Sequence, residues 1–239
     1  MKLHQYIIER INNALAESSS ELQVVDYRFP VSKEEVEARL KFFNIKKYSI
    51  ADDLSITVFE SVRLNGQGLK QLPFKFRSIG GDFNLSGNQL TSLEGCPREV
   101  EGSFDCSYNQ LKSLKFAPRE IGFHFGDEGV ASRNGRYMSF TGGFNCRGNQ
   151  LESLAGSPRV VSADFDCGDN KLTSLKGAPK EVGGDFGCSN NLLISLEGAP
   201  KEVGGDFYCT GNRNLKSLDG IGEVHGDTIS DFTNIVDEL

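Results

Sequence analysis

The sequence contains no tryptophan, only two methionines and three histidines, and no run of about 18 apolar residues. The missing apolar run excludes a transmembrane helix. The N-terminal residues carry charges throughout and lack the apolar stretch and cleavage site of a signal peptide, so we expect a cytoplasmic location. The histidines, His4, His124 and His225, lie too far apart in the sequence to indicate a metal cluster.

Positive charge is also scarce, with 26 Lys and Arg against 33 Asp and Glu and a net charge of −7. This balance disfavours binding to nucleic-acid backbones and to anionic membranes, which both need clustered basic residues. The sequence has no phosphate-binding loop, no dinucleotide-binding motif and no Ser-His-Asp order. We therefore expect a protein without catalytic activity, without a cofactor, and without a nucleic-acid or membrane partner.

The sequence does contain a short repeat. A phenylalanine occurs at the same position of each repeat, here called the anchor, and the sequence spacing from Phe83 to Phe104 is one period. The anchors are Phe83, Phe104, Phe144, Phe165, Phe186 and Phe207. The gap between Phe104 and Phe144 is almost two periods, and Phe125 lies one period after Phe104. These spacings predict an irregular turn of the repeat over residues 122–143.

Other columns keep the same phase as the phenylalanines. An aliphatic residue lies four positions before five of the anchors, at Ile79, Val100, Val161, Val182 and Val203, and Ile121 lies four positions before Phe125 in the irregular turn. A leucine or cysteine lies two positions after each anchor, at Leu85, Cys106, Cys146, Cys167, Cys188 and Cys209. An asparagine lies five positions after it, at Asn88, Asn109, Asn149, Asn170, Asn191 and Asn212. Two leucines follow each asparagine. Every period therefore contains the same residue types in the same order, as expected if each period forms one structural unit.

The spacing F-x-C-x-x-N-x-L-x-x-L is that of a leucine-rich repeat. Alternate strand residues share a face, so the Phe and Cys positions both point inward, and the Asn amide bonds backbone groups where the chain leaves the strand. Prolines in the return segments leave little room for helix there, and we expect extended or 3₁₀ segments instead. The predicted fold is an α+β leucine-rich-repeat solenoid with a parallel sheet on its concave face. A parallel β-helix of the same pitch is the competing fold, and the asparagine column favours the leucine-rich repeat.

The extent of the period predicts three parts: an N-terminal cap of residues 1–57, the solenoid of 58–228, and a closing segment of 229–239. In the cap we expect a helix over 2–17, a strand over 22–29 and a helix over 36–43. Ser32 and Glu35 form a capping box ahead of this second helix. Such a unit covers the apolar end of the first turn. Val224 continues the aliphatic column, whereas Thr228 replaces the phenylalanine.

Six cysteines raise the question of a disulfide or a metal site. Five of them fall in the inward column and only Cys96 lies outside it. Side chains stacked in register lie about 4.8 Å apart, whereas a disulfide needs Cβ atoms about 3.5–4.5 Å apart with converging directions. One column of thiols also cannot surround zinc tetrahedrally. We interpret the thiols as small, reduced core residues.

The residues on either side of each inward phenylalanine point outward and form an acidic stripe. The predicted binding residues of this stripe are Asp82, Asp105, Asp164, Asp166, Asp185, Asp206 and Tyr208, together with Arg147. One interpretation is a solvated face that keeps the sheet soluble. The other is a docking surface for a protein with a basic surface, which would relieve the repulsion between stacked aspartates.

The irregular turn has two interpretations as well. It is either a repeat eroded to a loop or a binding loop, since insertions in solenoids often lie at contact sites. Arg133, Arg136 and Tyr137 are residue types that anchor interfaces, and we include them as candidate binding residues. An enzymatic centre around His124 is a further hypothesis.

The turns GGDFGCSNNLLISLEGAPKEV and GGDFYCTGNRNLKSLDG resemble those of bacteriophage-encoded leucine-rich-repeat proteins, and the resemblance covers roughly residues 45–225. The resemblance implies the cytoplasm of a bacterial host and no particular chemistry. A solenoid without catalytic groups, with an acidic concave face and one irregular turn, leads to the hypothesis of a non-enzymatic protein that binds and inhibits a host defence or regulatory protein. The alternative is a structural or assembly component of a phage particle. The repeat is also similar to that of secreted bacterial effectors of the ubiquitin-ligase type, but their large catalytic domain has no counterpart in the leading segment 1–57.

Overall fold

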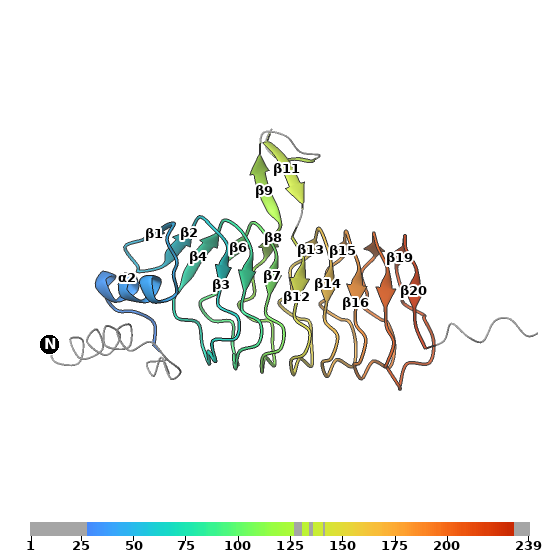
Figure 1. Ribbon diagram of the computed structural model, residues 1–239. Coiled ribbons are helices and arrows are strands. Elements are labelled where there is room, and N and C mark those ends of the chain that lie inside the picture. The colour runs from blue at the N-terminus through green and yellow to red at the C-terminus, as the bar shows by residue number, and fades with distance from the viewer. Residues whose placement is uncertain (1–27, 127–130, 134–135, 141, 232–239) are drawn as a thin grey trace, which may run out of the picture.

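The chain forms a parallel β-solenoid, with turns stacked side by side along one axis (Figure 1). The structure is a computed structural model that describes residues 28–126, 131–133, 136–140 and 142–231. Within these ranges one α-helix, α2 (Lys33–Phe42), precedes the coil. The return segments consist of turns and irregular backbone, so the predicted absence of helix from them is confirmed.

An eight-stranded parallel sheet, here called the Phe sheet, carries the phenylalanine column. Its strands are β3 (Val62–Arg63), β5 (Phe83–Asn84), β7 (Phe104–Asp105), β12 (Phe144–Asn145), β14 (Phe165–Asp166), β16 (Phe186–Gly187), β18 (Phe207–Tyr208) and β20 (Thr228–Ile229). Each phenylalanine pairs with that of the next turn, and successive ring centroids lie 5.1–5.7 Å apart. The predicted stacking of residues one period apart is therefore confirmed.

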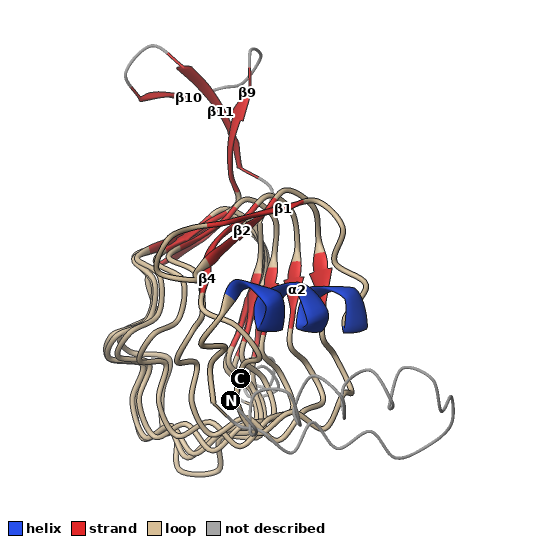
Figure 2. Cartoon of the chain, turned by 90° about the vertical axis from the view of Figure 1, so that its left-hand side faces the viewer, coloured by secondary structure: helices blue, strands red, loops and turns tan. Residues whose placement is uncertain are grey.

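The aliphatic column lies on two further sheets along another side of the coil (Figure 2). The first contains β1 (Tyr48–Ile50), β2 (Ile56–Val58), β4 (Phe76–Ile79), β6 (Glu99–Val100) and β8 (Glu120–Ile121). The second contains β13 (Val160–Val161), β15 (Glu181–Val182), β17 (Glu202–Val203) and β19 (Glu223–Val224). Within these two sheets only the pair β1–β2 is antiparallel. Each turn thus contributes two short strands, one more than the sequence pattern indicated.

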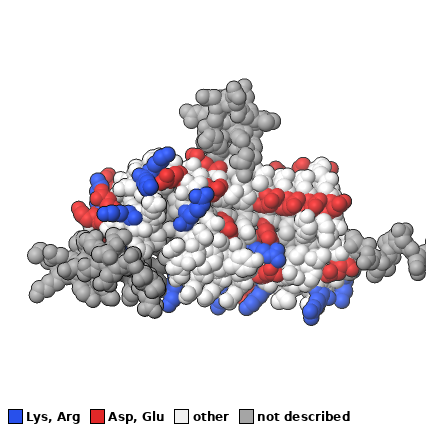
Figure 3. All heavy atoms as spheres, in the orientation of Figure 1, with Lys and Arg blue, Asp and Glu red and all other residues white. Residues whose placement is uncertain are grey.

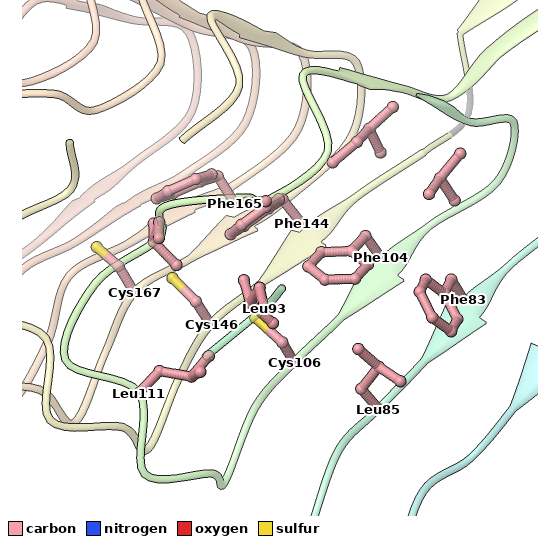
Figure 4. Packing of buried hydrophobic residues seen from close by; sticks show 14 of the residues in the cluster. Phe83, Leu85, Leu93, Phe104, Cys106, Leu111, Phe144, Cys146, Phe165 and Cys167 are labelled. Atoms are coloured by element: carbon pink, nitrogen blue, oxygen red, sulfur yellow. The ribbon is translucent and has the colours of Figure 1, made fainter. Parts of the chain in front are cut away.

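The predicted inward columns form one continuous core (Figure 4). The Phe, Cys and paired Leu positions from Phe83 to Leu215 are at most 3 % exposed. Cys96 is half-buried at the edge of this core. At the C-terminal end Val224 is also only half-buried, because no described turn packs beyond it.

The asparagine column is buried and bonds the backbone of two turns. In the turn of Asn170, Nδ2 donates to the carbonyl of Cys167 in the same turn and to that of Cys146 in the turn before, both at 3.1 Å. Oδ1 accepts the N–H of Leu151 at 3.0 Å. The same pattern recurs along the column, as predicted.

The predicted irregular turn over 122–143 is not a turn of the solenoid. Phe104 pairs directly with Phe144, so the coil continues as if the intervening residues were absent. Those residues instead form an antiparallel three-stranded sheet, here called the meander, with strand order β10-β11-β9. Its strands are β9 (Phe123–Gly126), β10 (Ala131–Arg133) and β11 (Arg136–Phe140). Phe125 therefore pairs with Met138 within the meander, and its agreement with the period is a coincidence.

Helix α2 lies across the N-terminal end of the coil (Figure 2). Val36 and Leu40 are fully buried, and the rings of Phe43 and Phe74 lie 6.0 Å apart. Ser32 is the N-cap and accepts the N–H of Glu35, as predicted.

The predicted capping box is incomplete, because the Glu35 carboxylate does not return to the cap residue. It accepts from the Val31 N–H at 3.2 Å and pairs with Arg39 at 2.8 Å, since the buried guanidinium needs a counter-charge. Residues 28 and 29 are not strand, which shortens the predicted strand over 22–29. The rest of that strand, the helix over 2–17 and residues 232–239 of the closing segment lie outside the described residues.

Candidate protein-binding surface

Four aspartates at successive turns form a continuous line over the C-terminal half of the coil. They are Asp164, Asp185, Asp206 and Asp227, here called the acidic row, and each directly precedes a strand of the Phe sheet. Figure 3 shows a line of acidic atoms across the C-terminal turns of the coil. None of the four has an ion-pair partner within the part of the chain that is described.

The carboxylates of the row are held in place by the backbone. Oδ1 of Asp164 accepts the N–H of Asp185 at 2.9 Å, and Asp185 and Asp206 accept the N–H groups of the next aspartates at 2.8 Å. Each bond satisfies a backbone donor at the corner where one strand begins. The row therefore presents fixed negative charges at the spacing of the strands.

Tyr208 lies beside the row, and the charges of the row change its pKa. Its hydroxyl donates to Oδ2 of Asp206 at 3.0 Å. This hydrogen bond raises the pKa of Tyr208, and the negative charges of Asp206, Asp185 and Asp164 raise it further. Tyr208 is exposed, so the predicted pair of acidic row and aromatic side chain does lie on one accessible surface.

The aspartates that follow the phenylalanines are arranged differently. Asp105 and Asp166 accept backbone N–H groups two residues later, at 2.9 and 2.8 Å, and so close the turn that ends each strand. Arg147 lies between Asp166 at 3.4 Å and Asp169 at 2.6 Å. Arg147 and Asp166 therefore neutralise one another and contribute little to the net charge of the surface.

The structure separates one predicted residue from the row and adds another. Asp82 lies at the same position of an earlier turn, but Ser103 and Gly143 stand between it and Asp164. Asp227 completes the row and was missed by sequence reasoning. It lies one period after Asp206, so the column itself could have identified it.

The meander carries the other predicted binding residues. Arg133 and Arg136 are paired in register, next to the turn that joins β10 and β11, and Tyr137 pairs with Ser132. His124 pairs with Ser139. Figures 1 and 2 show the meander rising from the coil, so these residues lie on a different part of the molecule from the acidic row.

The cysteines of the inward column lie in the interior of the coil. Burial raises the pKa of the thiols in the cysteine column above their ordinary value, to about 11 for Cys209, which makes them poor nucleophiles at neutral pH. In the ranges that the structure covers, no group of His, Cys, Asp and Glu is arranged to hold a metal ion. No helix in these ranges is both long and apolar enough to cross a membrane.

Comparison of the chain with protein-family models, with curated proteins and with solved structures finds no match. The functional proposal therefore depends on the geometry of the surface.

Proposed function

We propose that this chain is a non-enzymatic protein-binding module whose acidic row docks a protein with a basic surface. The observation that carries the proposal is the set of four aligned carboxylates without ion-pair partners among the described residues. In water, charges about 5 Å apart repel by roughly 1 kcal/mol. A cationic partner would relieve this repulsion, and hydrogen bonds to the backbone already fix the carboxylates in place, so little ordering cost would remain for binding.

The solenoid supports this proposal because its stacked turns form a rigid scaffold that holds the carboxylates of the acidic row in line. The turns have the buried asparagine ladder and paired leucines of leucine-rich repeats, and we assign them to that class. We also assign residues 1–57 to a cap, which α2 supports through its buried face against the first turn. The resemblance of the turns to those of phage-encoded proteins directs the search for the partner to bacterial hosts. We propose that binding inhibits a host defence or regulatory protein.

A comparative pull-down from bacterial lysate tests the acidic row. Asp164→Asn, Asp185→Asn and Asp206→Asn together remove three charges, while the amide Oδ1 still accepts the backbone N–H of the next turn. Alanine would break those hydrogen bonds and confound binding with stability. The matched control, Glu181→Gln, Glu202→Gln and Glu223→Gln, removes three exposed charges from the neighbouring sheet.

We expect one protein to be enriched on the wild type and on the glutamine control and to be lost from the asparagine variant. Retention on the asparagine variant would place the binding site elsewhere. Equal loss of the partner from both variants would indicate that it recognises the overall negative charge of the protein and not the acidic row.

A further inference from the structure

The turn that contains Phe207 has one residue more than the regular turns before it. Leu193 follows Phe186 by seven positions, whereas Leu215 follows Phe207 by eight. Beside the extra residue the surface has a hollow of about 380 Å³, past the C-terminal ends of β16 and β18 at the edge of the coil opposite the meander (Figure 1). The hollow is lined by Asn190, Asn191, Leu192, Gly211, Arg213 and Asn214.

The extra residue also interrupts a series of backbone hydrogen bonds that joins successive turns along this edge. The Leu192 N–H donates to the Leu172 carbonyl at 2.9 Å, and four earlier turns make the equivalent bond. The next bond of the series, from the Arg213 N–H to the Leu193 carbonyl, is absent from the described turns. The hollow therefore has a backbone donor in its lining that makes no hydrogen bond to a described residue.

Two exposed aliphatic side chains lie at this hollow. Leu192, which lines it, is 49 % exposed, and Ile194, the next outward side chain, is 64 % exposed, while Leu193 between them is buried in the core. In the four earlier turns the same two positions carry polar side chains: Gln89 and Thr91, Gln110 and Lys112, Gln150 and Glu152, and Lys171 and Thr173. A single exposed aliphatic residue is ordinary, but two neighbours that replace polar residues beside a hollow indicate a contact surface.

Cations lie on both sides of this aliphatic pair. Lys171 precedes Leu192 by one period and Arg213 follows it by one period, while Lys216 follows Ile194 after the extra residue. All three cations are exposed, and none has an ion-pair partner in the part of the chain that the structure describes. The surface therefore fits a peptide segment that carries aliphatic and acidic side chains together.

We propose that the occupant of this hollow is the chain's own segment 232–239. The segment follows Asp231, and Oδ2 of Asp231 accepts the N–H of Gly211, a residue of the hollow's lining, at 2.8 Å. Leu192 belongs to the turn before Gly211, about 5 Å away along the axis, whereas eight extended residues span up to about 28 Å. The segment can therefore reach the whole hollow.

The sequence of the segment, FTNIVDEL, has the required chemistry, because two aliphatic residues, Ile235 and Val236, directly precede two acidic ones, Asp237 and Glu238. Contact of the aliphatic residues with Leu192 removes apolar surface from water, and the carboxylates then lie near unpaired cations. Attachment at Asp231 also keeps the segment at a high effective concentration, so weak contacts suffice. The inference does not depend on the acidic row as a docking site.

Photo-crosslinking within the full chain tests this proposal. The apolar photoreactive residue p-benzoylphenylalanine in place of Ile194 lies at the proposed contact. The same residue in place of Lys112, at the equivalent position three turns earlier and about 14 Å away, is the control. After irradiation, we expect peptide mapping by mass spectrometry to join position 194 to segment 232–239 of the same chain, with at least fivefold less of such a product from position 112.

Two pairs of substitutions within the segment separate apolar contact from added charge. Ile235→Asp with Val236→Asp should lower the yield of the product from position 194 at least fivefold. Thr233→Asp with Asn234→Asp adds the same two charges to the same segment, and it should leave the yield within twofold.

Three results would overturn the proposal: no product between position 194 and the segment, a product that joins two chains on a denaturing gel, or equal yields from the two pairs of aspartate variants. The outcome is independent of the proposed function, because these variants keep all four aspartates of the acidic row. Loss of the partner from the asparagine variant in the pull-down, or its retention, conversely leaves the crosslink unaffected.

Discussion

Replacement of Asn170 by alanine is the sharpest test of the asparagine column, because this one side-chain amide joins the backbones of two turns. Its Nδ2 donates to the carbonyls of Cys146, Cys167 and Gly168 at 3.0–3.1 Å, and its Oδ1 accepts the N–H of Leu151 at 3.0 Å. The residue is 8 % exposed, so water cannot easily take over these bonds.

The cost follows from which backbone groups keep a partner. The carbonyls of Cys146 and Cys167 each retain an asparagine amide from their own or the following turn. Their loss amounts to about 1 kcal/mol each, the net value of an ordinary hydrogen bond. The Leu151 N–H has no second acceptor in the described residues and becomes a buried unsatisfied donor, at about 1–3 kcal/mol. We therefore expect the free energy of unfolding to fall by about 4 kcal/mol.

Urea denaturation followed by circular dichroism measures this loss, with the denaturant dependence unchanged if the folded state is intact. Asn145→Ala is the control. Its Oδ1 accepts only the Arg147 N–H at 3.0 Å and the side chain is half-buried, so the loss should be at most about 1 kcal/mol. A loss below about 1 kcal/mol for Asn170→Ala, or equal losses for the two variants, would refute the ladder as a main source of stability.

Three further predictions concern the turns, the helix and the thiols. Gly177→Ala should lower the melting temperature more than Gly66→Ala: both have positive φ, but only at Gly177 would a Cβ lie 2.7 Å from a backbone N atom of the preceding turn. Burial raises the pKa of Glu35, but the Val31 hydrogen bond and the Arg39 charge outweigh it, so the net pKa is below 4.5 and the stability it contributes is lost as the pH falls below that value. Glu35→Gln should therefore lower the melting temperature strongly at pH 7 and progressively less towards pH 3. Ellman's reagent should titrate at most one of the six thiols in the native protein and all six in urea.

The interior of the coil was predictable because a constant period leaves one consistent stacking of its apolar columns. Phe104, Cys167 and Asn170 were assigned to the interior from spacing alone, and they lie there. The second strand of each turn was not predicted, because a dipeptide such as Glu181–Val182 is too short to show an alternating pattern.

The meander was mistaken for a turn because the insertion is only slightly shorter than one period of the repeat. Phe125 then fell in phase, and only the direct pairing of Phe104 with Phe144 removes it from the coil. The acidic row was recognised as a column, but its bonds to the backbone were not. A surface aspartate has the same sequence pattern whether its carboxylate is solvated or bonded to the next turn, as that of Asp164 is.

The most direct test of the docking surface is calorimetric titration of the purified partner at several salt concentrations, with the wild type and with the combined asparagine variant. If aligned charges bind the partner, the wild-type affinity falls steeply with salt, and the variant binds at least tenfold more weakly with a shallower salt dependence. Equal affinities and equal salt dependence for the two proteins would contradict the acidic row as the binding site.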